Sequence, residues 1–264
     1  MVSIEKRTHS SEQQAVFDWI TQADYAIQQS DFLRERQGGT GQWLIDSKEF
    51  QSWLESSQQT IFCPGMPGAG KTMITSIVVK YLHENFPDEH KVGVAYIYCN
   101  FQRGQEQTPE DLLASLLKQL IQERNDIPQA VMELRELHRK KRTRPSFDEL
   151  LRTLRTVLGD NSRNFILVDA LDECQVTNNG RERFLSTIFG LQSTTGANIF
   201  ATSRHIPDIA KRFEGSIKVE IRATDEDVRR YVRSRSPELP ECVQSTAGLR
   251  TEVEDSIAVA VEGM

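Results

Sequence analysis

The chain has 264 residues and a formal net charge of −6, with 38% hydrophobic and 27% charged residues. These values are typical of a globular protein, and the length allows one large α/β domain with a smaller appendage. The negative charge balance gives no global sign of nucleic acid or an anionic membrane, so neither is expected as a partner. No run approaches the ~20 apolar residues of a membrane helix, and no signal-peptide stretch follows the N-terminus. A cytoplasmic location is therefore expected.

Residues 1–55 are expected to form a helical N-terminal segment and linker. Val16 and Ile20 lie at helical spacing, and a second short helix is predicted to pass through Trp53. Between them, the stretch 36–41 reads R-Q-G-G-T-G and breaks the helical pattern. This break is either a simple linker or a segment that lies against a nucleotide base, the ligand that the next motif predicts.

Residues 65–72 read G-M-P-G-A-G-K-T, which is the full phosphate-binding loop pattern G-x-x-x-x-G-K-[ST]. The apolar run 60–63 precedes the loop and suits a buried strand, while apolar residues at helical spacing follow it over 73–82. Strand, glycine loop and helix are the context that this motif requires. An ordinary glycine-rich turn is the alternative, and the eight-residue pattern in this context disfavours it. A P-loop NTPase core over residues 56–222 is predicted.

The residue types of this loop suit phosphate chemistry. Glycines without a Cβ let the backbone turn sharply and bring its N–H groups to phosphate oxygens. The helix that begins near Lys71 presents unpaired N–H groups and a partial positive charge to the same anion. Lys71 reaches the β- and γ-phosphates, and the Thr72 hydroxyl ligates magnesium. The predicted nucleotide-binding residues are Gly65, Gly68, Ala69, Gly70, Lys71 and Thr72.

The next hundred residues predict one further strand and several helices. Residues 92–99 form an apolar run that suits an interior strand. Thr108 is expected to cap an amphipathic helix, and Ser146 with Glu149 is expected to form a capping box for another. Between these helices lies the basic cluster 135–144. It is either a nucleic-acid or partner patch or a solvated helix end, and the lack of interleaved aromatic residues favours the helix end.

An acidic motif follows the buried run 165–168, which ends in Asp169. A buried strand that delivers a carboxylate at its end is how P-loop proteins hold magnesium through water, so Asp169 is predicted to hold the ion. Asp172 and Glu173 come one turn later, and one of them is predicted to orient or activate the attacking water. The alternative is a buried strand followed by an acidic turn without a ligand.

The remaining motif is the stretch 198–204, N-I-F-A-T-S-R, which predicts a buried strand ending in Arg204. This arginine is expected to sense or stabilise the γ-phosphate, or else to be a solvated surface residue.

Residues 216–221 alternate in hydrophobicity and predict a fifth strand. Five strands separated by helices predict a parallel sheet with helices on both faces and phosphate at its carboxyl edge. Residues 223–264 predict the start of a helical subdomain whose last apolar helix lacks a partner, which indicates a chain truncated from a longer protein.

Four cysteines stand at Cys63, Cys99, Cys174 and Cys242. They form no C-x-x-C pair, and no histidines stand at metal-ligand spacing, so no zinc site is expected. Cys63 and Cys99 fall on predicted buried strands and are expected to be core thiols. This usage fits a reducing compartment.

Together these motifs resemble the NACHT group of STAND-class P-loop NTPases. The resemblance is carried by the loop at 65–72, by L-V-D-A-L-D-E-C at 167–174 and by F-A-T-S-R at 200–204. The stretch 24–44 is more specifically similar to NACHT proteins of filamentous fungi, including incompatibility-type proteins with ankyrin or WD repeats that share a nephrocystin-like N-terminal domain. The resemblance covers about residues 24–264.

This resemblance implies a cytoplasmic signalling switch of the innate-immunity or heterokaryon-incompatibility kind. It implies that ATP or GTP with Mg²⁺ controls oligomerisation or effector release, and that protein partners or self-association are involved. It also implies that Asp169 coordinates the ion, that Asp172 and Glu173 support slow hydrolysis, and that Arg204 is a sensor on a strand between the phosphate-loop strand and the acidic strand. Ala170 stands where the family often has glycine, and the chain ends before the family's winged-helix region.

The residues alone leave two other functions to weigh against the switch. The first is a scaffold for protein partners in which nucleotide is structural or absent, suggested by the basic cluster and the C-terminal helix. The second is a small-molecule kinase, which is disfavoured because neither an acceptor site nor a lid is evident in the sequence.

Overall fold

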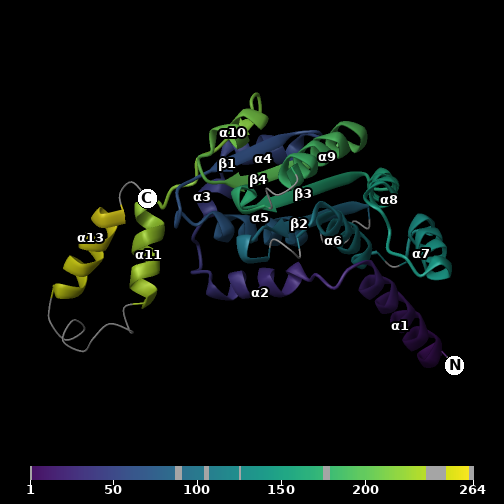
Figure 1. Ribbon diagram of the computed structural model, residues 1–264. Coiled ribbons are helices and arrows are strands. Elements are labelled where there is room, and N and C mark those ends of the chain that lie inside the picture. The colour runs from purple at the N-terminus through teal and green to yellow at the C-terminus, as the bar shows by residue number, and fades with distance from the viewer. Residues whose placement is uncertain are drawn as a thin grey trace.

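The centre of the molecule is a five-stranded sheet (Figure 1). A computed structural model describes residues 2–86, 91–103, 107–124, 126–174, 179–235 and 248–261. The strands are β1 (Thr60–Pro64), β2 (Val92–Tyr98), β3 (Arg163–Asp169), β4 (Asn198–Ser203) and β5 (Ile217–Lys218). All pairings are parallel, in the order β2-β3-β4-β1-β5. The predicted α/β P-loop NTPase fold is confirmed, and β4 lies between β1 and β3 as the resemblance implies.

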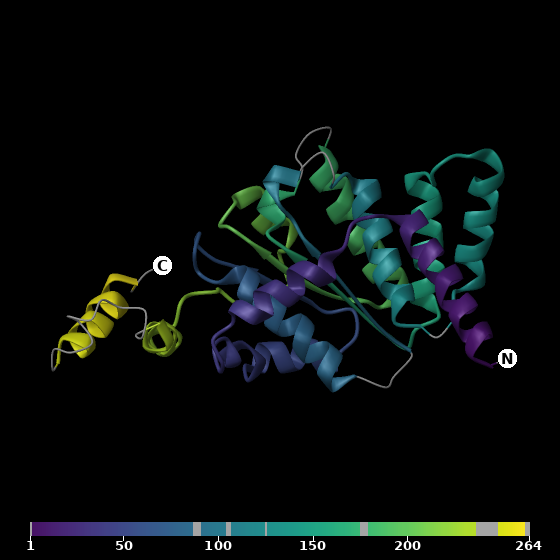
Figure 2. The ribbon, with the colours of Figure 1, turned by 90° about the horizontal axis from the view of Figure 1, so that it is seen from below.

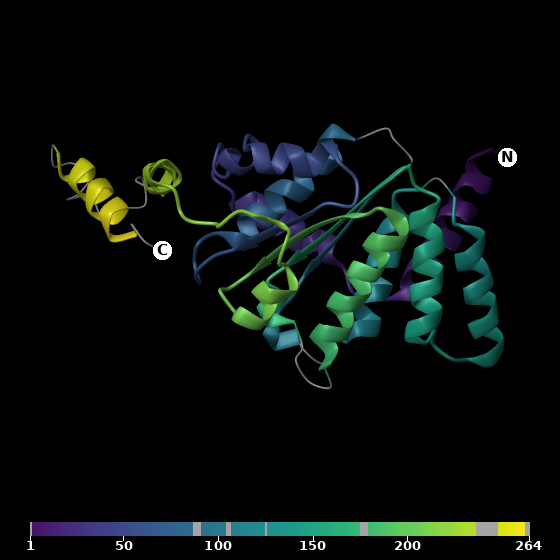
Figure 3. The ribbon, with the colours of Figure 1, turned by 90° about the horizontal axis from the view of Figure 1, so that it is seen from above.

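The strands read as continuous apolar runs because helices cover both faces of the sheet. Helices α3, α4 and α5 lie on one face, and α6, α8, α9 and α10 lie on the other (Figures 2 and 3). Helix α2 packs against α5 and the edge strand β2, and α7 packs against α8. The helices on the first face, with the adjoining α2, are α2 (Tyr25–Glu35), α3 (Gln42–Ile45), α4 (Lys48–Glu55) and α5 (Lys71–Asn85). The helices on the other face, with the adjoining α7, are α6 (Pro109–Gln122), α7 (Gln129–Lys141), α8 (Phe147–Gly159), α9 (Gly180–Thr195) and α10 (Pro207–Arg212).

The remaining helices lie at the two ends of the chain. Helix α1 (Val2–Ile20) reaches α6, while α11 (Asp225–Arg235) and α13 (Leu249–Val261) pair with each other at one side of the molecule (Figure 1). Two short 3-10 turns, η1 (Phe101–Arg103) and η2 (Leu171–Glu173), follow β2 and β3. Within the described ranges, no helix combines the length and apolar character needed to cross a bilayer.

Helix α4 belongs to the same hydrophobic core as the sheet. Trp53 is fully buried, with its ring centroid 5.3 Å from that of Phe165 on β3 and 6.1 Å from that of Phe200 on β4. Its indole N–H donates to the Ile199 carbonyl at 2.9 Å, which satisfies the polar end of a buried aromatic side chain. The predicted cap at Thr108 and the predicted capping box at Ser146 are both confirmed and start α6 and α8, and Thr108 also forms a capping box with Asp111.

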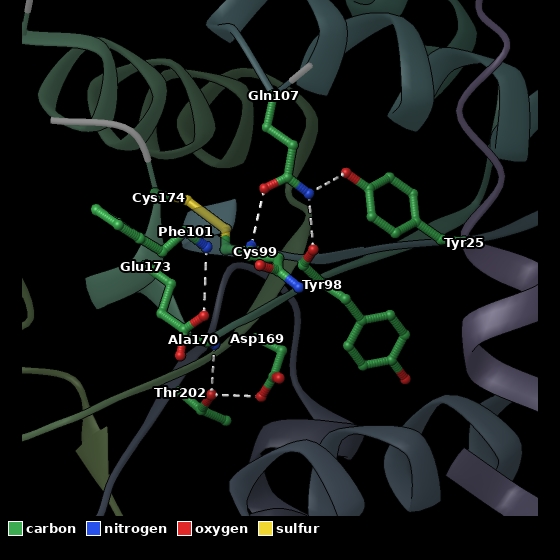
Figure 4. Close-up of a disulfide and its surroundings, with 11 residues drawn as sticks. Tyr25, Tyr98, Cys99, Phe101, Gln107, Asp169, Ala170, Glu173, Cys174 and Thr202 are labelled. Carbon is green, nitrogen blue, oxygen red and sulfur yellow. Dashed lines mark hydrogen bonds between the residues drawn. A yellow bond between two sulfur atoms is a disulfide. The ribbon is translucent and has the colours of Figure 1, made fainter. Parts of the chain in front are cut away.

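One prediction about the cysteines is wrong. Cys99 is not a free core thiol, because it forms a disulfide with Cys174, 75 residues away, at a Cα–Cα distance of 5.2 Å (Figure 4). The parallel register pairs Tyr98 with Asp169, so the residues just after β2 and β3 meet at one edge of the sheet. Cys63 is a free, fully buried thiol as predicted, and burial raises its pKa. Cys242 lies outside the described residues.

Candidate nucleotide-binding site

The phosphate-binding loop connects β1 to α5 with a backbone that requires glycine. Gly68 and Gly70 adopt φ values of +82° and +90°, and Gly70 is the N-cap of α5. A Cβ on Gly65 would lie 2.6 Å from the Ile221 carbonyl oxygen, so the segment after β5 passes close over the start of the loop. The first amides of α5 have no acceptor within their own helix, which leaves them directed toward an anion at the loop.

The ammonium group of Lys71 lies across this loop. Its Nζ donates to the carbonyl oxygens of Gly65, at 2.9 Å, and Met66, at 2.8 Å. Burial lowers the pKa of Lys71, while the carboxylates of Asp172 and Asp169 oppose that shift. A phosphate oxygen is a stronger, charge-assisted acceptor for this group than a neutral carbonyl.

Asp169 ends β3 in a buried cluster of threonine hydroxyls. Thr72 donates to one of its carboxylate oxygens at 2.6 Å, and Thr75 and Thr202 donate to the other at 2.9 and 2.6 Å. Asp169 is only 2% exposed, and burial raises its pKa against these hydrogen bonds. The structure therefore brings the predicted metal residues Thr72 and Asp169 together. It adds Thr75 and Thr202, two polar residues within apolar stretches that the sequence analysis did not identify.

Asp172 and Arg204 form a close pair where η2 meets the end of β4. The Arg204 amide donates to one carboxylate oxygen of Asp172 at 2.9 Å, and its guanidinium Nε donates to the other. The Asp172 side chain is 2% exposed and that of Arg204 is 50% exposed. Burial acts to raise the pKa of Asp172, but the hydrogen bonds and charge of Arg204 hold it below its ordinary value. Both oxygens of Asp172 are thus committed to Arg204.

The other predicted acidic residue, Glu173, points toward η1, the turn that follows β2. Its Oε2 accepts from the Phe101 amide at 3.4 Å (Figure 4). Asp169, Asp172, Glu173 and Arg204 all contribute to the electrostatic environment of Lys71. Residues predicted from three separate stretches therefore lie around one lysine at the carboxyl edge of the sheet.

A cavity of about 560 Å³ adjoins the loop. It is lined by Glu35, Gln37, Thr40, Gly41, Trp43, Gly68, Ala69, Gly70, Met73, Ile74, Ile77, Ile221, Arg222, Ala223, Asp227, Val228, Tyr231, Val232, Arg235 and Ile257. The break at 36–41, for which two interpretations were open, thus forms part of its wall. Gly41 has φ +74° and donates its amide to Asp227 on α11 at 3.1 Å, and a Cβ there would lie 2.6 Å from Ile77 Cδ1. Its size and its largely apolar wall suit a small organic ligand.

Fold and loop together define the class of this protein as a P-loop NTPase fold with its motif at the carboxyl edge of the sheet. The family described as Nephrocystin 3, N-terminal, matches residues 39–204, which is more than half of the chain. The chain belongs to this family.

More distant similarities were also found. Over 80 residues, the chain is 36% identical to the ORC1-type DNA replication protein 1 of Sulfurisphaera tokodaii, covering 30% of this chain and 18% of that protein. The structure of the Aeropyrum pernix ORC1 protein in complex with DNA is similar with a TM-score of 0.49 and 16% identity, covering 81% of this chain and 57% of that chain. A structure described as replication initiator DnaA bound to AMPPCP and single-stranded DNA is similar with a TM-score of 0.42 and 18% identity, covering 88% of this chain and 65% of that chain. The chain thus spans only part of the length of each.

These similarities correct one expectation. The net charge predicts no nucleic-acid partner, whereas two of the similar structures are described as DNA complexes. The physical reason is that a net charge of −6 is a sum over the whole chain, and it does not describe the charge of any one surface. The net charge therefore does not exclude nucleic acid.

Proposed function

We propose that this chain is a nucleotide-binding switch module of the NACHT type, which binds ATP or GTP with Mg²⁺ and hydrolyses it slowly. The observation that carries the proposal is the convergence of Lys71, Thr72 and Asp169 at the start of α5. An ammonium, a hydroxyl and a carboxylate in this arrangement suit a phosphate tail and a hard cation. The three motifs in NACHT order support the finer assignment to that group.

The loop residues have distinct roles in this proposal. The amides of residues 68–72 and the ammonium of Lys71 hold the phosphates, and the Thr72 hydroxyl is a ligand for Mg²⁺. Asp169 holds the ion indirectly and fixes the Thr72 hydroxyl at 2.6 Å. Bound Mg²⁺ supplies charge neutralisation at the phosphates. These residues fit Mg²⁺, because their ligand atoms are polar oxygens that buried hydrogen bonds hold in position at one edge of the sheet.

The apolar cavity beside the loop is proposed to hold the nucleoside. Its floor is formed by α5 next to Gly70, so a ligand with phosphates on the loop extends directly into it. Its other walls come from Thr40 in the N-terminal segment and from Val228 on α11. A bound nucleotide would therefore contact the sheet body and the C-terminal helices together, which is the coupling that a switch requires.

Hydrolysis is proposed to depend on the acidic turn after β3. Glu173 is the candidate to orient the attacking water, because both oxygens of Asp172 already accept hydrogen bonds from Arg204. Asp172 is then a positioning residue, which holds Arg204 at the site as a sensor of the γ-phosphate. A cytoplasmic location and control of self-association or of a protein partner belong to the same proposal.

Direct binding of nucleotides tests this function. We expect fluorescently labelled ATP or GTP to bind with one site per chain, with weaker binding when Mg²⁺ is removed by a chelator. Comparing both triphosphates with their diphosphates would identify the preferred base. A melting temperature unmoved by Mg-ATP far above any plausible dissociation constant would instead support the scaffold, since a ligand that binds the folded state must stabilise it.

Arg204→Ala is expected to lower the preference for triphosphate over diphosphate. The affinity for ATP should fall roughly tenfold, as for one charged hydrogen bond, while that for ADP stays within about twofold. Arg212→Ala is the matched control, because Arg212 is an arginine of α10 that pairs with Glu182 at 3.7 Å. Equal losses for ATP and ADP in competition titrations would rule out the sensor role.

A further inference from the structure

The Cys99–Cys174 disulfide joins the end of β2 to the acidic turn that carries Asp172 and Glu173 (Figure 4). We propose that this pair is a reversible thiol–disulfide site, made and broken by exchange with small thiols and their disulfides, and that its oxidation state sets the order of the acidic turn. The effect on hydrolysis rests on the proposed function, whereas the effect on the turn does not.

Cys99 holds the acidic turn at both ends. Its backbone amide donates to the Asp169 carbonyl at 3.2 Å, before the turn begins. Its sulfur is bonded to Cys174, directly after Glu173. Residues 170–173 therefore form a loop whose two ends are both attached to Cys99, which is its anchoring residue. Without the S–S bond, Cys99 holds this loop at its N-terminal end alone.

The anchoring residue is itself held firmly. Gln107 accepts from the Asn100 amide at 2.9 Å and donates to the Tyr98 carbonyl at 2.8 Å, so it holds the backbone on both sides of Cys99. Gln107 is 5% exposed, and it also donates to the Tyr25 hydroxyl at 2.9 Å (Figure 4). Breaking the disulfide should therefore leave β2 in place and change the acidic turn.

The acidic turn has a backbone that needs such restraint. Ala170 adopts φ +52° and ψ +52°, a left-handed conformation that is unfavourable for a residue with a Cβ. Its amide is held by the Thr202 hydroxyl at 2.9 Å. At the other end of the turn, the Cys174 amide bonds only locally, to the Leu171 carbonyl at 3.3 Å. The disulfide thus restrains the end of the turn that carries Glu173.

The exchange chemistry balances without a metal or a further reductant. In oxidation, one cysteine thiolate attacks a small disulfide such as glutathione disulfide, forms a mixed disulfide and expels one small thiolate. The second cysteine thiolate attacks the mixed disulfide, forms the Cys99–Cys174 bond and expels the second small thiolate. The two cysteine protons pass to the two small thiolates. Reduction by two small thiols is the reverse.

The other described cysteine is unsuited to this exchange. Cys63 is fully buried on β1, and its raised pKa disfavours the thiolate that exchange requires. The Cys99–Cys174 pair is also buried, with Cys99 6% and Cys174 2% exposed, but it lies at the carboxyl ends of β2 and β3, where only the short turns η1 and η2 follow. Exchange is therefore expected at one pair among the described cysteines.

Hydrogen exchange and hydrolysis of the intact chain test the proposal. The protein is equilibrated with glutathione disulfide or with dithiothreitol, and peptide mapping by mass spectrometry reports the Cys99–Cys174 link. Reduction should speed amide exchange over residues 170–174 and leave residues 92–98 unchanged. It should also lower Mg-ATP hydrolysis roughly threefold to tenfold through misplacement of Glu173. Nucleotide affinity should change less than about twofold, since no phosphate-loop donor is touched.

Variants separate this pair from other thiols. Cys174→Ser should behave like the reduced protein in both buffers, and Cys242→Ser should respond as the wild type does. Failure of the Cys99–Cys174 link to form, or equal exchange over 170–174 in both redox states, would overturn the inference. If neither form binds nucleotide, the proposed function fails, and the exchange difference over 170–174 alone decides the thiol–disulfide site.

Discussion

Lys71→Ala is expected to weaken binding of Mg-ATP about tenfold to a hundredfold, the loss of a charged hydrogen bond of ~1.5–3 kcal/mol. The physical reason is that Lys71 is the ammonium group positioned across the phosphate-binding loop, within 2.9 Å of the Gly65 and Met66 carbonyls. Its removal leaves the loop amides and α5 in place, so binding should weaken without loss of the fold. Isothermal titration calorimetry measures the change.

Lys80→Ala is the matched control for this experiment. Lys80 lies on the same helix and pairs at the surface with Glu84, one turn further on. Surface pairs of this kind contribute at most about 1 kcal/mol to stability, and this one lies away from the loop. Its removal should leave affinity unchanged. An unaltered affinity of the Lys71 variant for Mg-ATP would contradict the proposed site.

Asp169→Asn is expected to separate function from stability. Mg-dependent hydrolysis should fall about a hundredfold, because the carboxylate that holds the ion and orients Thr72 loses its charge. The free energy of unfolding at neutral pH should stay equal or rise, since the variant buries no charge and an amide still bonds to the threonine hydroxyls. Asp46→Asn, at an exposed position, is the control and should change neither quantity.

The pH dependence of stability provides an independent check on Asp169. Burial raises the pKa of the folded carboxyl above its value in the unfolded chain. Between the two pKa values, the folded state keeps a proton that the unfolded state has lost. The contribution of Asp169 to stability therefore falls as pH rises, and it is smallest above the pKa of the folded state. Urea titrations of wild type and Asp169→Asn across this range should show that slope in the wild type only. Parallel curves would exclude a raised pKa.

The sequence was sufficient to predict the parts of the fold that depend on local patterns. The strand before Gly65, the glycine loop and the helix after Lys71 form one continuous motif whose residue types dictate its backbone. The carboxylate of Asp169 was predictable from the apolar run it ends. The break at 36–41 was visible as a loss of helical periodicity, but its place against the cavity depends on α11, nearly two hundred residues later.

The resemblance implied the place of β4 in the sheet, but the side-chain contacts between neighbouring strands were not predictable. Thr202 reaches Asp169 because β4 pairs with β3 in register, and local composition does not encode that register. The pairing of Asp172 with Arg204 arises where β3 and β4 end beside each other. This pairing makes Asp172 the residue that positions Arg204 in the proposed function, instead of the residue that activates water. The Cys99–Cys174 bond likewise requires β2 and β3 to be neighbours, although they are separated by three helices in the chain.

A crystal structure of the chain with a non-hydrolysable ATP analogue and Mg²⁺ tests the central claim most directly. We predict that the β- and γ-phosphates lie on the loop 65–72, that Lys71 leaves the Gly65 and Met66 carbonyls for them, and that the ion lies on the Thr72 hydroxyl beside Asp169. An analogue bound elsewhere, with Lys71 still on the two carbonyls, would contradict the claim.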